Sequence, residues 1–361
     1  MCAVTKPTVT VLIDTFNHER FIEEAVVSVL EQDFSAAETE ILVVDDGSTD
    51  RTPDILRKFG PRLRVLRKEN GGQASAFNLG IPQATGEFLA FLDGDDWWAK
   101  NKLTRAVETF QAEPELGFVG HGDIFVFPDG STQLHALHES VRFCAGNLEG
   151  ALLFRLRKSF MGTCRMTVRT EILRRVLPIP EALRIQADEY MFTLAAALCE
   201  VRILPEPLFF YRFHDSNAFQ MTVSSDVNRL RRKQAVLAEL ARTLVLRLQA
   251  FGVDPAAIGA IAESVQLEAN QLRLQVDGGW SWETVETEWK TYRISYPNAP
   301  RYHQMFKALT MAAALLVPPK CFSWIRQRLT RNDYYLRLRG RFLPIPHQTH
   351  IRRAWLQKPR P

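Results

Sequence analysis

Four short apolar runs, each followed at once by a polar cluster, constrain the fold of this chain more than any other feature. The runs lie at residues 9–14 (VTVLID), 41–44, 64–66 and 88–92 (FLAFL), and the clusters are DTFNHE, DDGSTD, ENGGQ and DGDD. Because apolar residues at helical spacing follow the first two clusters, strands and helices alternate. This alternation predicts an α/β fold with a mainly parallel sheet, and it places all four clusters at the carboxyl edge of that sheet.

A second region of similar size follows, and the chain then becomes helical. Strands are expected at 117–127 and 201–211, and helices at 148–156 and 184–199. Beyond residue 228 a stripe of leucines at helical spacing indicates a long helix, with further helices at 256–276 and 282–292. The sequence therefore predicts an α/β body with a C-terminal helical extension.

Charge is distributed unevenly along the chain. The formal net charge is +4, but residues 301–361 contain 13 Lys and Arg against one acid, a net charge of +12, so residues 1–300 carry −8. Aromatic and basic residues such as Trp324 and Arg326 favour a helix on an anionic membrane surface, and the alternative is that these arginines cover the acidic body. The acidic body lacks a recognised nucleic-acid motif, so we expect no nucleic-acid partner.

Cysteine usage and the N-terminus indicate a reducing compartment. The five cysteines are scattered and form no CxxC pair. The N-terminus lacks the basic and long apolar regions of a signal peptide, and the apolar run at 308–317 is shorter than the roughly 20 residues that span a bilayer. We predict a cytoplasmic protein, attached peripherally to the inner membrane face by its tail.

The strongest chemical signal is the DGDD cluster, which holds Asp93, Asp95 and Asp96. Three carboxylates so close together repel one another, and their position after a buried strand is costly unless a cation offsets the charge. Their hard oxygen atoms suit Mg²⁺ or Mn²⁺. The alternative is a solvated acidic turn that caps the next helix.

A similar cluster, DDGS at residues 45–48, follows the second run. One of its carboxylates is suited to accept the imide N–H of a uracil ring or to bind a ribose hydroxyl, whereas the alternative is a helix-capping turn. Thr15, Asn17 and Glu19 would line the neighbouring loop or serve as helix caps, Asn17 for the first helix. The backbone N–H groups of residues 70–73 (NGGQ) form a candidate diphosphate cradle.

Together, the runs VTVLIDTFNHERFIEEAVVSVLEQDF, ILVVDDGSTDRT, ENGGQASAFNLGI and GEFLAFLDGDD resemble the nucleotide-sugar-binding half of glycosyltransferase family 2. The resemblance covers roughly the first 110 residues and implies the GT-A fold, a Rossmann-like sheet flanked by helices. It also implies an inverting enzyme that moves a sugar from a nucleoside diphosphate sugar, with a UDP-sugar favoured, to a glycan or lipid-linked hydroxyl in cell-surface polysaccharide synthesis. The alternative is a non-catalytic nucleotide-sugar or glycan-binding protein of the same fold.

The resemblance implies roles for particular residues of the first half. Asp46 and the Thr15 loop would lie near the base, Asp93 near the sugar or ribose, and Asp95 on a divalent metal ion that bridges the diphosphate. The expected donor-binding residues are Thr15, Asn17, Glu19, Asp46, Asn78, Asp93 and Gly94.

Two residues of this region depart from the family's usual pattern. Asp14 stands where the family usually has Pro, which bears on base recognition. Phe77 stands before Asn78 where the family often has Arg, which removes a charge contact to the donor.

In the second half, Asp188 and Glu189 resemble the family's acidic pair at the acceptor side, one of which takes a proton from the attacking hydroxyl. We favour Asp188 as this base, although the order of the pair would align Glu189 with it, and a plain helix-capping pair is the alternative. His214 stands where related enzymes place a His, so it would complete a metal site with Asp93 and Asp95, or it is structural. The expected segments are 1–115 (donor half), 116–222 (acceptor half), 223–300 (helical extension) and 301–361 (basic amphipathic tail).

Overall fold

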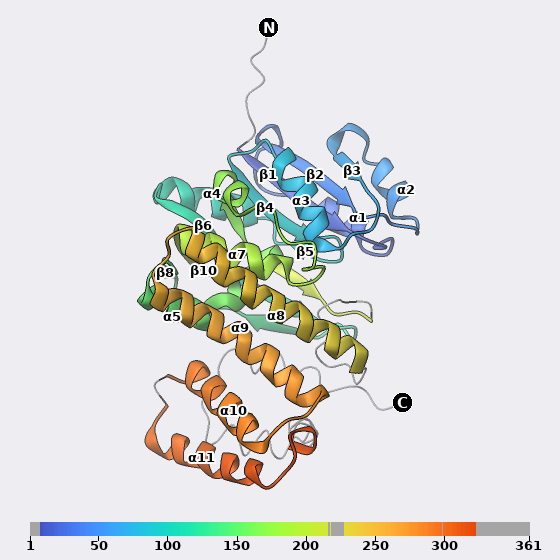
Figure 1. The fold of residues 1–361 in the computed structure, drawn as a ribbon. Helices are drawn as coiled ribbons and strands as arrows, with labels where there is room; N and C mark the ends of the chain where they lie inside the picture. The colour runs from blue at the N-terminus through green and yellow to red at the C-terminus, as the bar shows by residue number, and fades with distance from the viewer. Residues whose placement is uncertain (1–7, 216, 218–226, 298, 323–361) are drawn as a thin grey trace. The chain divides into compact units, whose positions relative to one another are not determined.

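The computed structural model describes residues 8–215, 217, 227–297 and 299–322. Its strands form one sheet in the order β3-β2-β1-β4-β9-β6-β10-β5, with β7 beside β6 and β8 beside β10 (Figure 1). The strands are β1 (Val9–Thr15), β2 (Thr39–Asp45), β3 (Arg64–Arg67), β4 (Phe88–Asp93), β5 (Trp97–Trp98), β6 (Leu116–Val126), β7 (Thr132–His135), β8 (Val141–Phe143), β9 (Thr167–Arg169) and β10 (Glu200–Arg212).

The longest strand pairings of the sheet are parallel. Strand β1 lies parallel to both β2 and β4, β2 lies parallel to β3, and β6 lies parallel to β10. The shorter strands β5, β7, β8 and β9 pair antiparallel with their neighbours. The prediction of an α/β fold with a mixed, mainly parallel sheet is confirmed.

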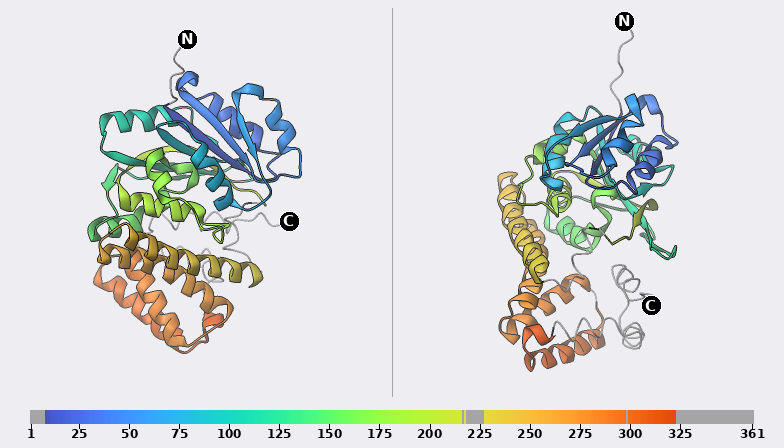
Figure 2. Two further views of the ribbon diagram at one scale, coloured as in Figure 1. Left: turned by 45° about the horizontal axis from the view of Figure 1, so that its top comes forward. Right: turned by 90° about the vertical axis from the view of Figure 1, so that its right-hand side faces the viewer.

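Helices cover both faces of this sheet, as can be followed in Figure 2. The helices of the α/β body are α1 (Ile22–Leu30), α2 (Thr52–Arg57), α3 (Gln73–Gln83), α4 (Lys102–Ala112), α5 (Leu148–Arg157), α6 (Thr170–Val176) and α7 (Ala187–Leu198). Two short 3₁₀ helices, η3 (Lys158–Phe160) and η4 (Thr163–Arg165), lie between α5 and β9.

The apolar runs are continuous because both sides of the central strands are buried. On one face, Ile13 of β1 and Leu92 of β4 belong to the same core cluster as Val26 of α1 and Leu103 of α4. On the other face, α3 approaches so closely that a Cβ atom on Gly80 would lie 2.5 Å from Leu12. Strands buried on both faces lack the polar alternation of exposed strands.

One expected helix cap is wrong. Helix α1 begins at Ile22, and its first turn has no side-chain cap. Asn17 instead adopts a left-handed conformation (φ 57°), and its Oδ1 accepts a hydrogen bond from Thr49 N at 2.8 Å. The side chain therefore ties the loop after β1 to the loop after β2.

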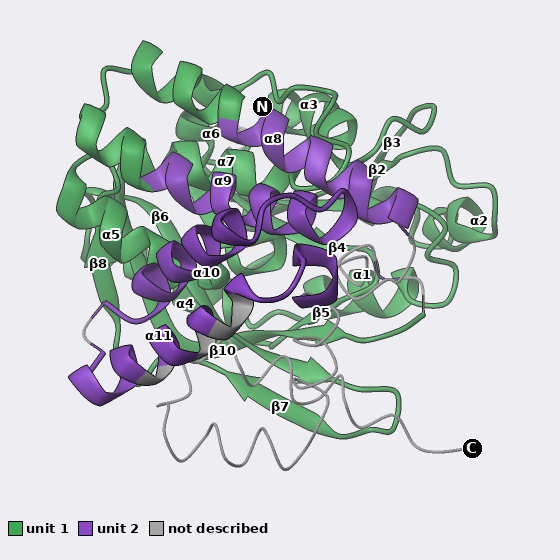
Figure 3. Cartoon of the chain, turned by 60° about the horizontal axis from the view of Figure 1, so that its bottom comes forward, with its two compact units in different colours: residues 1–216, 242–260 green, residues 217–241, 261–361 purple. Residues whose placement is uncertain are grey.

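The chain divides into two compact units (Figure 3). Unit 1 contains residues 1–216 and 242–260, and unit 2 contains residues 217–241 and 261–361. The C-terminal helices are α8 (Val227–Ala250), α9 (Pro255–Val276), α10 (Ser281–Ser295) and α11 (Arg301–Leu315). Leu237, Leu240, Leu244 and Leu248 of the expected stripe are fully buried.

Two expectations for the C-terminal part meet the limits of the described residues. Among those residues, none of the helices has both the length and the hydropathy that crossing a bilayer requires. The basic tail, including Trp324 and Arg326, lies outside them from residue 323 onward.

Candidate functional site

Two carboxylates stand side by side where the parallel strands β1 and β4 end. Asp14 is the register partner of Asp93. The Oδ1 atoms of both side chains are buried, and neither has a hydrogen-bond partner among the described residues. Burial, reinforced by neighbouring carboxylates, raises the pKa of Asp14 well above its ordinary value and that of Asp93 to about 7. Burying two such carboxylates costs folding free energy unless a cation or a ligand rich in hydrogen-bond donors pairs with them.

Asp95, the next acid along the turn, lies against two histidines. Its Oδ2 is 2.9 Å from Nε2 of His214 and 3.9 Å from Nε2 of His18. The His214 ring packs on Phe21 with centroids 4.5 Å apart. Burial opposes ionisation of Asp95, but the hydrogen bond with His214 and the charge of His18 outweigh it and lower the pKa. The structure thus brings together the expected pair Asp95 and His214.

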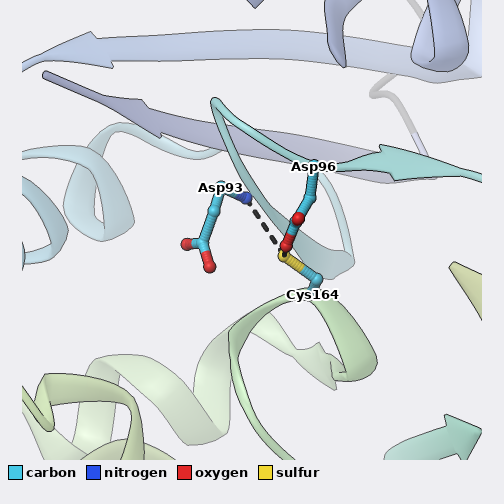
Figure 4. Close-up of side chains that lie close together, drawn as sticks. All are labelled: Asp93, Asp96 and Cys164. Atoms are coloured by element: carbon cyan, nitrogen blue, oxygen red, sulfur yellow. Dashed lines mark hydrogen bonds between the residues drawn. The ribbon is translucent and has the colours of Figure 1, made fainter. Parts of the chain in front are cut away.

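Asp96 contacts other groups than Asp95 does, and these contacts hold the turn in place. Its Oδ1 accepts a hydrogen bond from Arg212 N at 2.8 Å, and its Oδ2 lies 3.4 Å from Sγ of Cys164. Asp93, Asp96 and Cys164 form a close cluster with ligand atoms within 4.8 Å of one another (Figure 4). Burial raises the pKa of the Cys164 thiol well above its ordinary value, so the sulfur stays protonated. A protonated, soft thiol suits Mg²⁺ or Mn²⁺ poorly.

Asp46 organises the loop between β3 and α3. Its carboxylate accepts hydrogen bonds from Lys68 Nζ at 2.7 Å and from the backbone N–H groups of Gly71 and Gly72. Residues 70–73 were expected to offer these N–H groups to a diphosphate. That expectation is wrong for Gly71 and Gly72 in this structure, because Asp46 already occupies their N–H groups.

Thr15 and Gly94 are in close contact at the end of the sheet. Thr15 Oγ1 lies 3.2 Å from Nδ1 of His18. A Cβ atom on residue 94 would lie 2.7 Å from both Thr15 Oγ1 and His18 Nδ1, so only glycine fits. Thr15 and His18 therefore pack against Gly94 in the middle of the Asp93–Asp95 turn.

Glu19 and Asn78 hold other parts of the chain. Glu19 Oε2 accepts a hydrogen bond from Arg51 N at 3.0 Å, which ties the first loop to the second as Asn17 does. Both ends of the Asn78 amide are bound to the backbone of Ile179 at 2.8 Å. Asn78 therefore holds the segment before α7 in place.

The two acids at the start of α7, Asp188 and Glu189, have different partners. Glu189 is ion-paired with Lys158, with Nζ and Oε1 2.6 Å apart. Asp188 Oδ1 accepts a hydrogen bond from Glu189 N, and its Oδ2 accepts a long one from Thr163 N at 3.4 Å. Burial raises the pKa of Asp188. Asp188 also raises the pKa of Asp93 through its charge, so the two carboxylates are near enough to repel each other.

Sequence reasoning missed three residues of this region. His18 stands inside the DTFNHE cluster, and its position directly after a strand was the available signal. Arg212 donates through Nε to Asp95 O at 3.0 Å and stacks over the Trp97 ring at 4.3 Å. Arg165, whose hydrogen-bond partner Asp123 is 42 positions away, left no local signal.

Comparisons with known proteins agree with this arrangement. The family model described as glycosyl transferase family 2 matches residues 10–177. An uncharacterized glycosyltransferase, alr2836 of Nostoc sp., is 35% identical over 240 residues, which are 63% of this chain and 71% of that protein. The putative teichuronic acid biosynthesis glycosyltransferase TuaG of Bacillus subtilis is 40% identical over 130 residues, 35% of this chain and 50% of that protein.

Solved structures agree on the fold. The crystal structure of S. aureus TarS 1–349 in complex with UDP-GlcNAc has a TM-score of 0.57 and 19% identity, covering 89% of this chain and 92% of that one. At this identity the likeness concerns the fold alone, and it confirms the expected GT-A architecture. Together with the family model and the alr2836 match, it shows that this chain belongs to glycosyltransferase family 2.

Proposed function

We propose that this glycosyltransferase is a metal-dependent, inverting enzyme that moves a sugar from a UDP-sugar to a hydroxyl of a glycan or lipid-linked acceptor in cell-surface polysaccharide synthesis. The observation that carries the proposal is a pair of buried carboxylate oxygens, on Asp14 and Asp93, that have no partner within the described ranges of the chain; Asp95 and His214 follow in the same site. The UDP-GlcNAc complex of TarS supports a UDP-sugar donor, and the name of TuaG supports a cell-surface polymer.

Asp93, Asp95 and His214 would hold Mg²⁺ or Mn²⁺. The residues fit such an ion because carboxylate oxygens and an imidazole nitrogen are suitable ligands, and because Asp93 Oδ1 lacks a partner among the described residues. When bound, the ion would offset the charge that builds on the departing diphosphate.

The donor's nucleotide would lie along the loops after β1 and β2. Thr15, Asp46 and Gly94 are the proposed contacts. Thr15 and Gly94 touch at the end of the sheet, and Asp46 N donates a hydrogen bond to Thr15 O at 2.9 Å. Asn17 and Glu19 would act by holding the two loops together.

Asp188 would serve as the general base. Its Oδ2 accepts a long hydrogen bond from Thr163 N and has no cationic partner as close as Lys158 is to Glu189 among the described ion pairs. In a single in-line displacement, Asp188 takes the proton of the attacking hydroxyl and the new C1–O bond forms. The C1–O bond to the diphosphate breaks, and UDP leaves with the electron pair.

The location proposed for the enzyme is the cytoplasmic face of a membrane. Helix α11 and the residue that follows it expose several apolar side chains, and the segment from residue 301 onward carries 13 basic residues against one acid. The exposed side chains are Tyr302, Met305, Leu309 and Leu316. Sedimentation with anionic liposomes at low salt tests this attachment, and a protein that stays in the supernatant would contradict it.

The acidic pair offers a matched test of the proposed activity. Release of UDP from a panel of UDP-sugars with Mn²⁺ should be detectable for the wild type. It should fall about 10²-fold or more in Asp188→Asn. Glu189→Gln should retain most of the activity once its folding is verified. Absence of release from every UDP-sugar, or equal losses in both variants, would contradict the proposal.

A further inference from the structure

The buried acid Asp123 fixes the side chain of Arg165 by two hydrogen bonds. Nε and Nη2 of Arg165 donate parallel hydrogen bonds to the two oxygens of Asp123 at 2.8 and 2.9 Å. Asp123 is fully buried, and its Oδ1 also lies 2.6 Å from Nδ1 of His135. The guanidinium rests over the Phe209 ring at 5.0 Å. The two-point contact fixes both the position and the orientation of the guanidinium plane.

The third nitrogen of Arg165 has no hydrogen bond in the part of the chain that the structure describes. Arg169, at the end of the neighbouring strand β9, differs in this respect from Arg165 on η4. Arg169 uses all three nitrogens, on Leu116 O, on Glu87 Oε1 and on Pro114 O. Nη1 is not one of the buried, unpartnered side-chain atoms of the described residues, so this edge of the partly buried guanidinium is open to solvent and to a ligand.

Nη1 of Arg165 and Oδ2 of the proposed base Asp188 both lie close to Gly162. A Cβ atom on Gly162 would lie 3.1 Å from Nη1 of Arg165 and 3.4 Å from Oδ2 of Asp188. The glycine therefore leaves the place between a fixed N–H donor and a carboxylate oxygen unfilled.

The charges around Asp188 suit a base that must be ionised. Burial raises its pKa, and Arg165 opposes that rise. Asp93 faces it from the end of β4, while Glu189 on its own helix is paired with Lys158. Among these groups, Arg165 is the cation that favours the charged form of Asp188.

We propose that Arg165 positions the acceptor, with Nη1 donating a hydrogen bond to the oxygen next to the hydroxyl that Asp188 deprotonates. The acceptor therefore presents two vicinal oxygens, as a sugar ring or a polyol does. This inference rests on the proposed function, since it takes Asp188 as the base. A two-point grip lowers the cost of orienting the attacking hydroxyl.

The test compares attacking molecules with and without a second oxygen. UDP release from UDP-GlcNAc is measured with water alone, with 1-propanol and with glycerol, for the wild type, Arg165→Lys, Gly162→Ala and the control Arg169→Lys. UDP binding is measured by calorimetry on the same proteins. Lysine keeps the positive charge but cannot hold Asp123 and donate through a second edge at once.

We expect glycerol to accelerate wild-type UDP release more than 1-propanol does. Arg165→Lys and Gly162→Ala should lower the ratio of glycerol-stimulated to water-only UDP release by about tenfold or more, while their UDP affinity stays within about twofold. Arg169→Lys should keep the acceleration. A purely structural role would lower hydrolysis and acceleration together.

Three results would overturn the inference: retained acceleration in Arg165→Lys, a parallel loss of hydrolysis, or no preference of the wild type for glycerol. Failure of the wild type to bind UDP or release it from any UDP-sugar would instead defeat the proposed function.

Discussion

The α/β body buries carboxylates at two places, and the pKa values of the carboxyl groups shift in opposite directions at these two places. On β6, Asp123 is fully buried, yet Arg165 and His135 occupy its oxygens and outweigh burial, so that its pKa is lowered. At the ends of β1 and β4, Asp14 and Asp93 have raised pKa values, and each has one oxygen without a partner in the part of the chain that the structure describes.

This difference distinguishes a carboxylate that stabilises the fold from one that is available to a ligand. A carboxylate with satisfied oxygens stabilises the fold and presents its partner, here Arg165, to the surroundings. A buried carboxylate that the chain leaves unpartnered costs stability, and such a cost is understandable where a ligand supplies the missing partner. The following predictions test this contrast from the largest expected effect to the smallest.

The largest effect is expected at the turn that follows β4. Asp95→Asn should lower the rate of UDP release about 10³-fold, because charge stabilisation at the leaving diphosphate is the main contribution to such a reaction. Circular dichroism verifies that the variant is folded, because the lowered pKa of Asp95 means that its charge also stabilises the fold. Asp54→Asn, an exposed acid on α2, is the control and should keep its activity. Activity within a few fold of the wild type in Asp95→Asn would remove Asp95 from the site.

The satisfied centre should respond in stability. Asp123→Asn leaves the buried Arg165 without its counter-charge, and we expect a loss of about 3 kcal/mol in the free energy of unfolding. Urea denaturation followed by circular dichroism measures the shift in midpoint, and the exposed Asp129→Asn should leave that midpoint in place. An unchanged midpoint in Asp123→Asn would mean that the network does not support the fold.

The proposed base should be visible in the pH dependence. Because burial raises the pKa of Asp188, kcat/KM should decline on the acid side with a midpoint above about pH 4, the ordinary range of an aspartate. Activity rises with pH as Asp188 loses its proton. The residual activity of Asp188→Asn should lack this acid limb, and an identical limb in that variant would assign it to another group.

The smallest effect is an increase in stability. Asp93 has a pKa of about 7, raised from 3.8, so its contribution to stability declines as pH rises from about 4 to about 7. With a chelator present, Asp93→Asn should be more stable than the wild type by about 1 kcal/mol at pH 8. Near pH 5 the difference should be smaller. Lower stability of the variant at pH 8 would show that the carboxylate supports the fold.

Much of the fold was predictable because its central strands are buried on both faces. The runs at 9–14 and 88–92 correspond to β1 and β4. By contrast, β5 and β9 have two and three residues, and each is a strand only because it pairs with a distant partner. A local pattern carries no information about such partners.

The same distinction applies to the site. The Asp93–Asp96 turn was predictable because its chemistry lies within four residues. The pairing of Arg165 with Asp123 was not, because it joins segments 42 positions apart. The detailed role of Asp46 was also hidden, since its hydrogen bonds with Gly71 and Gly72 arise only when two loops meet.

The central claim is that the unpartnered carboxylate edge is a metal-dependent donor site. Calorimetric titration with UDP, with and without Mn²⁺, of the wild type and of Asp95→Ala tests it most directly. We predict binding of UDP by the wild type that requires Mn²⁺ and is lost in Asp95→Ala. Equal UDP affinity with and without Mn²⁺, unchanged in Asp95→Ala, would contradict the account.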